Sequence, residues 1–228
     1  MITSPHNPKL KDLRRLARRR DGRFVAEGED LLAAAQAAGW PARARFVAAG
    51  SGLDGEEVEP EVLARVSALG SGTRAIGVYD ERWSAPLGPR CVALWAVGDP
   101  GNVGTIVRGA LAFGASSVAL GPDCADPFGP KAVRASMGAI FAVPVARVAA
   151  VAELPGQRIA LVARAGEPLL GPAAIPVSMV VGAEREGLPD DVVAACDRVA
   201  HIPIASESLN AAMAATVALY ELSRVQRP

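Results

Sequence analysis

Three short segments of this chain combine glycine with polar side chains, and each follows an apolar run. They span residues 98–108, 181–187 and 206–210. Glycine lets a backbone approach a ligand closely, while asparagine, serine, arginine and glutamate side chains bind polar groups. Parallel α/β sheets place ligands beyond the carboxyl ends of their strands. The three segments together therefore predict one ligand pocket built from several strand ends.

In the first segment, the residues that could do chemistry are Asn102 and Arg108. Asn102 stands where a helix should begin, and asparagine there commonly caps exposed backbone N–H groups. Arg108 falls on an otherwise apolar helix, so it needs water or a partner such as the carboxylate of Glu184. It could instead bind an RNA phosphate or stabilise the negative charge that develops during a reaction. Because arginine keeps its proton, we expect positioning and electrostatic stabilisation from it rather than base catalysis.

The other two segments also allow a structural and a functional interpretation. Gly182 ends an apolar strand, and Glu184 could bind a substrate or accept hydrogen bonds from loop amides. Ser208 and Asn210 precede the last expected helix, where they could cap it or act in a site. Leu209 between them could be core or pocket wall.

Other chemistries lack their motifs. The sequence has no GxxxxGK[ST] loop and no GxGxxG fingerprint. Its histidines are His6 and His201, without an HExxH motif, so neither a metal site nor a Ser–His–acid triad is expected. The cysteines Cys91, Cys124 and Cys196 are far apart and predict free thiols in a reducing compartment.

Charge is distributed unevenly along the 228 residues, although the net charge is zero. Residues 1–23 hold eight Lys and Arg against two Asp. We expect RNA phosphate contacts from Arg14, Arg15, Arg18 and Arg19. The alternative is a solvated helix face. No apolar run approaches the roughly 20 residues of a membrane helix and no signal peptide is evident, which predicts a cytoplasmic protein.

The elements that would position these residues alternate between helix and strand. Up to about residue 80 they form a small α/β unit, and a Pro- and Ser-containing linker follows at 84–89. Apolar strands and helices then alternate to the end, which predicts a parallel sheet. Within that second part we expect a strand at 140–143. The expected domains are 1–84 and 90–228.

The motifs also carry a resemblance. Asn102-x-Gly104-x-x-x-Arg108, Gly182-x-Glu184-x-x-Gly187 and Ser208-Leu209-Asn210 resemble the three motifs of the SpoU/TrmH family. These are S-adenosylmethionine-dependent RNA ribose 2'-O-methyltransferases of the SPOUT class. The third motif usually continues with Val and Ser, where this chain has Ala211 and Ala212.

The resemblance implies an α/β fold in which a small N-terminal RNA-binding domain precedes a methyltransferase domain with a trefoil knot and a parallel sheet. It implies a homodimer with no metal. Catalytic roles would fall to Asn102, Arg108, Glu184, Ser208 and Asn210. The S-adenosylmethionine pocket would be lined by Gly182, Ile202 and Leu209.

The N-terminal unit resembles the small RNA-binding domain of many family members, which favours ribosomal RNA over transfer RNA as the substrate. Its matching residues include Asn7, Pro8, Glu27 and Gly28. Two other classes stay open: a non-catalytic RNA-binding protein of the same fold, and a nicotinamide-dependent oxidoreductase.

Overall fold

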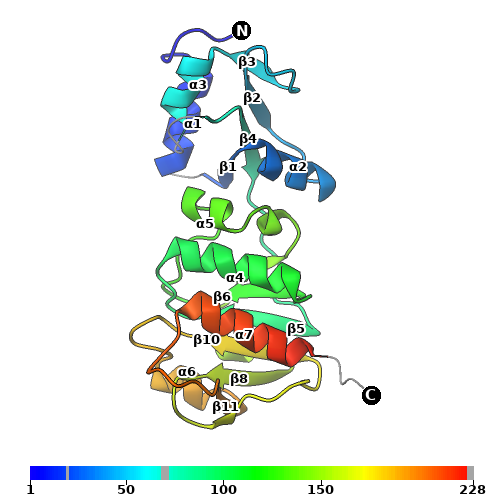
Figure 1. Cartoon of the computed structure of the whole chain (residues 1–228), viewed down its shortest axis with the longest axis vertical. Helices are drawn as coiled ribbons and strands as arrows, with labels where there is room; N and C mark the ends of the chain where they lie inside the picture. Colours follow the sequence, from blue (N-terminus) through cyan, green and yellow to red (C-terminus); the bar gives the residue numbers. More distant parts are fainter. Residues whose placement is uncertain (19–20, 68–71, 225–228) are drawn as a thin grey trace. The chain divides into compact units, whose positions relative to one another are not determined.

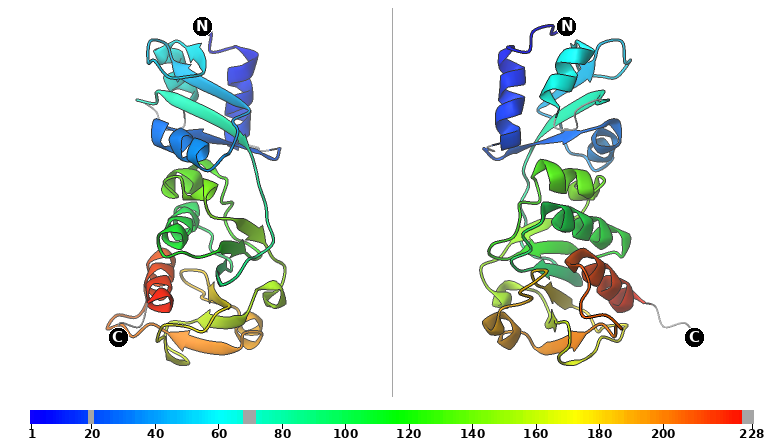
Figure 2. Two further views of the ribbon diagram at one scale, coloured as in Figure 1. Left: turned by 90° about the vertical axis from the view of Figure 1, so that its right-hand side faces the viewer. Right: turned by 60° about the vertical axis from the view of Figure 1, so that its left-hand side comes forward.

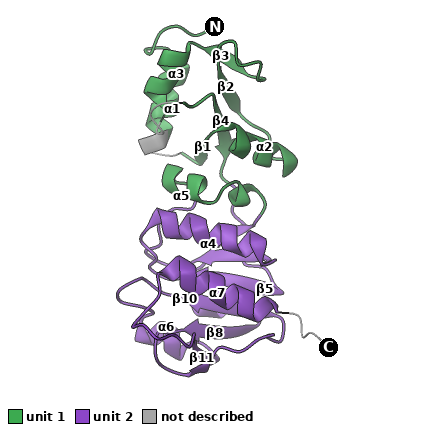
Figure 3. Ribbon diagram, in the orientation of Figure 1, with its two compact units in different colours: residues 1–81, 128–142 green, residues 82–127, 143–228 purple. Residues whose placement is uncertain are grey.

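The chain divides into two compact units in the computed structural model, which describes residues 1–18, 21–67 and 72–224 (Figure 1). One unit combines Met1–Glu81 with Phe128–Ala142, and the other combines Arg82–Pro127 with Val143–Pro228 (Figure 3). The segment Phe128–Ala142 falls in the expected second domain by sequence position, but its contacts are with the first unit. The assignment of an RNA-binding and a catalytic role to the two parts stays a prediction.

The first unit is built on a four-stranded sheet in the order β1-β4-β2-β3, antiparallel except for the β2–β3 pair. Its elements are α1 (Pro8–Arg18), β1 (Arg23–Glu27), α2 (Glu29–Ala37), β2 (Ala44–Ala48), β3 (Glu56–Val58), α3 (Pro60–Val66), β4 (Ala75–Asp80), α5 (Pro130–Ala135) and the 3-10 helix η1 (Ala139–Phe141).

Helix α1 packs through leucines spaced three residues apart. Leu10, Leu13 and Leu16 are buried in one cluster with Phe46 and Ile76 of the sheet. The outer side of this helix carries the charged residues, as an amphipathic helix requires.

An aromatic cluster explains why Phe128–Ala142 belongs to the first unit. The ring of Phe128 lies 4.9 Å from that of Phe24 between centroids, and Phe141 lies 5.0 Å from Tyr79 and 5.3 Å from Trp40. Such ring pairs contribute beyond the area they bury.

The second unit is a seven-stranded parallel sheet in the order β7-β6-β5-β10-β8-β11-β9, so the expected α/β class with a parallel sheet is confirmed. Its elements are β5 (Arg90–Leu94), α4 (Pro100–Ala112), β6 (Ser117–Leu120), β7 (Val145–Arg147), the 3-10 helix η2 (Val151–Glu153), β8 (Gln157–Leu161), β9 (Glu167–Pro168), β10 (Val177–Val181), α6 (Asp190–Ala194), β11 (Arg198–His201) and α7 (Ala211–Ser223).

Helices cover both faces of this sheet. On one face α4 and α7 lie side by side (Figure 2). Gly109 allows this close packing, because a Cβ there would already touch the Thr216 hydroxyl at 3.2 Å. On the other face Val151 and Val192, from η2 and α6, are buried in one cluster with Ala93 of the sheet. The central strands are therefore apolar on both sides, as a covered parallel sheet requires.

One expected strand is wrong. Residues 139–141 form the 3-10 helix η1, and the next strand is β7, which starts at Val145. Ile140 and Phe141 are buried in the first unit. A short apolar run has the same composition in a strand and in a buried helical turn, so the pattern could not separate them.

Within the described ranges no helix combines the length and apolar character needed to cross a membrane.

Candidate active site

A pocket of about 370 Å³ opens in the second unit where β8 and β10 end. Gly182, Ile202 and Leu209, the three expected cofactor residues, all line it, together with Glu184 and Ser208. Much of the remaining wall is apolar: Leu161, Val162, Ala163, Val181, Leu188, Ile204, Ala211 and Ala214. The structure thus gathers two of the three motif segments around one cavity.

The loop after β10 is a small closed hairpin. The N–H of Ala183 donates to the carbonyl of Gly187 at 3.0 Å, and the Gly187 N–H donates back at 3.1 Å. A Cβ on Gly182 would overlap the backbone of Gly187 and Leu188. The space that a side chain would need at Gly182 is therefore filled by the loop itself and not held open for a ligand.

A hydrogen-bonded chain of three side chains joins all three motifs. The amide of Asn102 donates through Nδ2 to Oε1 of Glu184, and Asn210 Nδ2 donates to Asn102 Oδ1 at 3.1 Å. These residues are 82 and 108 positions from Asn102 in the chain. Asn102 is thus held from both sides, which fixes its orientation.

Asn102 does not cap α4. The side chain of Asp99 is the cap: its Oδ1 accepts from the N–H of Asn102 at 3.0 Å, and Pro100 follows as the first helical residue. The amide of Asn102 is therefore available for Glu184 and Asn210. Asn210 in contrast fills both expected roles, because its Oδ1 also caps α7 by accepting from the N–H of Ala212 at 2.9 Å.

Arg108 lies on the outward side of α4 and is exposed. The described residues offer it no hydrogen bond or ion pair, and the carboxylate of Glu184 bonds to Asn102 instead. Arg108 follows Asn102 by six positions, which is about 9 Å along a helix axis. The structure therefore leaves this cation available to bind a group from outside the chain.

Ser208 is also exposed, at the pocket edge. Its carbonyl accepts weakly from the Ser206 hydroxyl at 3.4 Å, and its own hydroxyl bonds to no described residue. It is placed to meet a ligand but is not fixed by the protein.

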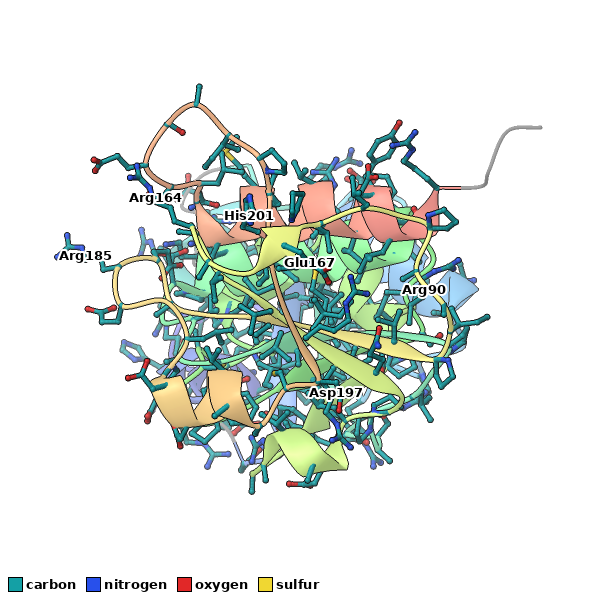
Figure 4. All side chains as sticks on the ribbon, turned by 90° about the horizontal axis from the view of Figure 1, so that it is seen from below. Arg90, Arg164, Glu167, Arg185, Asp197 and His201 are labelled. Carbon is teal, nitrogen blue, oxygen red and sulfur yellow. The ribbon has the colours of Figure 1, made fainter. Side chains whose placement is uncertain are left out.

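Sequence reasoning missed Arg185, which lines the pocket from the loop after β10. Figure 4 shows its side chain and that of Arg164 projecting outward from neighbouring loops. Arg164 lies 3.9 Å from the carboxylate of Glu207. Arg185 lies inside the second motif segment, and that position could have indicated that it lines the pocket.

Two of the expected RNA-binding arginines, Arg14 and Arg15 of α1, are engaged with the protein. Arg15 pairs with Asp12 at 2.7 Å and with Asp21 at 2.9 Å, and Arg23 pairs with the same two carboxylates. Hydrogen bonds from Arg23 and then Arg15 lower the pKa of Asp21 to about 2. Arg14 donates to the carbonyl of Pro5 at 3.3 Å.

The side chain of Arg18 and the whole of Arg19 lie outside the described residues. Much of the positive excess that is described is therefore balanced locally, although Arg15 stays exposed on the surface.

Among the residues with described positions, no three His, Cys, Asp or Glu side chains gather as a metal site would require. The cysteines Cys91, Cys124 and Cys196 are free, and burial raises the pKa of each thiol.

The chain has relatives whose family is known. Residues 89–220 match the SpoU rRNA Methylase family. An uncharacterised tRNA/rRNA methyltransferase of Synechocystis is 32% identical over 99% of this chain and 94% of its own. The 23S rRNA (uridine(2479)-2'-O)-methyltransferase of Streptomyces viridochromogenes is 36% identical, over 55% of this chain and 49% of its own.

A solved structure covers nearly the whole chain. The crystal structure of an rRNA methyltransferase from Sinorhizobium meliloti superimposes with a TM-score of 0.85, at 30% identity over 97% of this chain and 96% of that one. Both units are thus included in the likeness. The family match covers more than half of the residues, and it includes the pocket and the three motifs that meet there. The chain therefore belongs to the SpoU rRNA methylase family of RNA methyltransferases.

Proposed function

We propose that this protein transfers a methyl group from S-adenosylmethionine to a ribose 2'-hydroxyl of RNA, and that the RNA is ribosomal. The observation that carries the proposal is the Glu184–Asn102–Asn210 chain joined to a pocket lined by Gly182, Ile202 and Leu209. The 2'-O specificity is supported by the named activity of the Streptomyces relative. A 23S rRNA (guanosine(2553)-2'-O)-methyltransferase of Bacillus subtilis, 35% identical over 56% of this chain, supports it further.

The pocket fits the cofactor in character. Its apolar walls suit a nucleoside ring, and its polar rim at Glu184 and Ser208 suits the reacting end. The Sinorhizobium enzyme has been solved with S-adenosylmethionine bound, at a TM-score of 0.84. The bound cofactor would supply a methyl group on a sulfonium centre.

The protein's own contribution would be alignment. Asn102 is fixed between Glu184 and Asn210, so its amide can orient a ribose hydroxyl without itself reorganising. Arg108 would bind a phosphate beside that ribose or stabilise the charge that develops. The hydroxyl proton would leave to phosphate or water, because none of these residues is an obvious strong base.

The test is methyl transfer from labelled cofactor to RNA from cells that lack this protein. We expect label in ribosomal RNA at a linkage resistant to alkaline hydrolysis, which marks a blocked 2'-oxygen. Label in transfer RNA alone would show that the substrate is transfer RNA and not ribosomal RNA. Binding of NAD without binding of S-adenosylhomocysteine would contradict the proposal altogether.

We also propose that the protein acts as a homodimer through α4 and α7. One side of α7 carries three exposed apolar side chains, Met213, Val217 and Tyr220. Leu111 is also exposed, on the neighbouring helix α4. Large apolar side chains grouped on one surface mark an interaction site. A second copy of the chain can cover this surface with the same residues.

Val217→Glu is expected to convert the dimer to monomer, because it would place a charge in the apolar interface. Light scattering across a concentration series would measure this. Leu87→Glu is the control, since Leu87 lies in the segment before β5 and is 44% exposed, against 41% for Val217. A wild type that is monomeric at micromolar concentration would refute the dimer.

The arginines near the N-terminus give a separate prediction. Replacing Arg14, Arg15, Arg18 and Arg19 by Ala should weaken RNA binding and flatten its salt dependence, with a slope change of about 0.7–0.9 for each phosphate that is no longer neutralised. Because Arg15 is shared with Asp12 and Asp21, it should contribute less than an unpaired arginine. Affinity and slope equal to wild type would leave this segment as a solvated helix face.

A further inference from the structure

A second hollow of about 500 Å³ opens at the same edge of the parallel sheet as the cofactor pocket. It lies where β6 and β7 end, between the loop 121–127 and Trp83. None of the three motif segments contributes to its walls. The carboxyl edge of such a sheet is where ligands bind, so this hollow needs an account of its own.

Trp83 and Arg147 form one wall as a stacked pair. The guanidinium carbon of Arg147 lies 4.0 Å from the centre of the indole ring. The backbone builds this arrangement, because the N–H of Ser84 donates to the carbonyl of Val145 at 2.8 Å and fastens the segment beside β7. A flexible arginine is thereby held against the indole ring, and less conformational freedom is lost when a ligand binds.

Arg147 differs in its surroundings from the arginines of α1. Arg147 is exposed. Its guanidinium stacks on the indole of Trp83 and forms no ion pair with a carboxylate of the described residues. No ion pair with a described residue therefore takes up its positive charge, although Asp123 and Asp126 line the same hollow.

The floor of the hollow is attached to the chain that leads to Asn102. The N–H of Gly121 and the thiol of Cys124 donate to the carbonyl of Leu94 at 2.8 and 3.2 Å. The N–H of Ala125 donates to the carbonyl of Val97 at 2.9 Å. Asp99, the cap of α4, follows two residues after Val97. A group bound in the hollow would thus rest on the loop that enters the catalytic helix.

Two carboxylates, those of Asp123 and Asp126, also line the hollow. Asp123 lines it in the left-handed conformation with φ of 59°, is exposed, and forms no hydrogen bond or ion pair with a described residue. A carboxylate repels a phosphate but accepts from the N–H groups of a base edge. A stacked guanidinium beside an acceptor fits a nucleobase better than a phosphate group alone.

We propose that this hollow binds an unpaired base of the substrate RNA that flanks the methylated nucleotide, with the base stacking on the Trp83–Arg147 pair and Asp123 accepting from its N–H edge. The inference rests on the proposed function, because it requires an RNA substrate. It adds a subsite that selects the sequence around the target.

The test uses the full-length protein with S-adenosylhomocysteine, a single-stranded RNA of about 12 nucleotides, and an abasic strand of equal length. Trp83→Ala should weaken binding of the base-containing RNA about tenfold and leave the abasic strand unchanged. Trp83→Phe should restore most of the affinity. Asp123→Asn should change the preference among the four bases.

Tryptophan emission gives a readout that a merely structural role would not move. Trp40 and Trp95 are 9% and 7% exposed, so a base that stacks in the hollow should quench chiefly Trp83. Quenching by the base-containing RNA should disappear in Trp83→Phe although binding persists. Quenching that persists unchanged in Trp83→Phe would overturn the proposal.

Arg147→Ala is compared with Arg198→Ala, which removes from β11, across the sheet from β7, an arginine that pairs with Glu167. We expect only Arg147→Ala to weaken binding of the base-containing RNA. Equal weakening by both variants would show a general charge effect and overturn the subsite. If wild type binds both ligands and methylates RNA while Trp83→Ala and Arg147→Ala match it, the subsite alone fails. If wild type binds neither cofactor nor RNA, the proposed function fails.

Discussion

Arg108→Ala is expected to lower the rate of methyl transfer by about 100-fold or more, the scale seen when a preorganised charge-stabilising group is removed. Arg108 is exposed on α4 and has no carboxylate partner among the described residues, so its charge is available to the RNA. The measurement is a single-turnover rate with RNA and cofactor both saturating. Calorimetry with S-adenosylhomocysteine should show unchanged cofactor affinity, because Arg108 does not line the pocket.

Two further variants separate the possible roles of Arg108. Arg108→Lys keeps the charge but loses the planar fork, so an intermediate rate would indicate that bidentate phosphate binding matters. Arg224→Ala is a control, because Arg224 is paired with Glu221 at the end of α7. If Arg108→Ala is folded and fully active, its side chain is only a solvated part of the helix surface.

The parallel sheet and the gathering of the motifs could be predicted from sequence because both depend on simple rules. Apolar runs separated by helices give parallel strands, and parallel strands end at one edge. That is why Asn102, Glu184 and Asn210 meet although they lie far apart in the chain. The family resemblance added the chemistry, which periodicity alone does not reveal.

Details that depend on long-range packing could not be predicted. Phe128 and Phe141 join the aromatic cluster of the first unit, and nothing in their local sequence names Phe24 or Tyr79 as partners. The trefoil knot likewise has no periodic signature and stays an expectation of the resemblance.

The capping of α4 could have been predicted correctly. Asp99 and Asn102 are both residues that cap helices well. Pro100 distinguishes them, since proline is favoured at the first helical position and so places the cap at Asp99. The same signal would have predicted that the side chain of Asn102 is not needed as a cap and can take part in the active site.

Gly182→Ala is expected to abolish measurable binding of S-adenosylhomocysteine. The added Cβ alone would overlap the backbone of Gly187 and Leu188, so the loop after β10 could not close as it does. Glu184 sits in this loop and Leu188 lines the pocket, so both the polar chain and the pocket wall would move. Calorimetry on the folded variant measures the loss, and circular dichroism confirms that the sheet remains.

Gly187→Ala is the matched comparison, because it adds the same methyl group to the other end of the loop. Gly187 has φ of 71°, and a Cβ there would meet nothing within 4 Å. Its cost is therefore backbone strain of about 1–2 kcal/mol, which should weaken cofactor binding roughly 30-fold at most. Gly182→Ala has no such open space and should be much the worse of the two. If the two variants bind equally, loop closure at Gly182 is not what shapes the pocket, and the prediction is refuted.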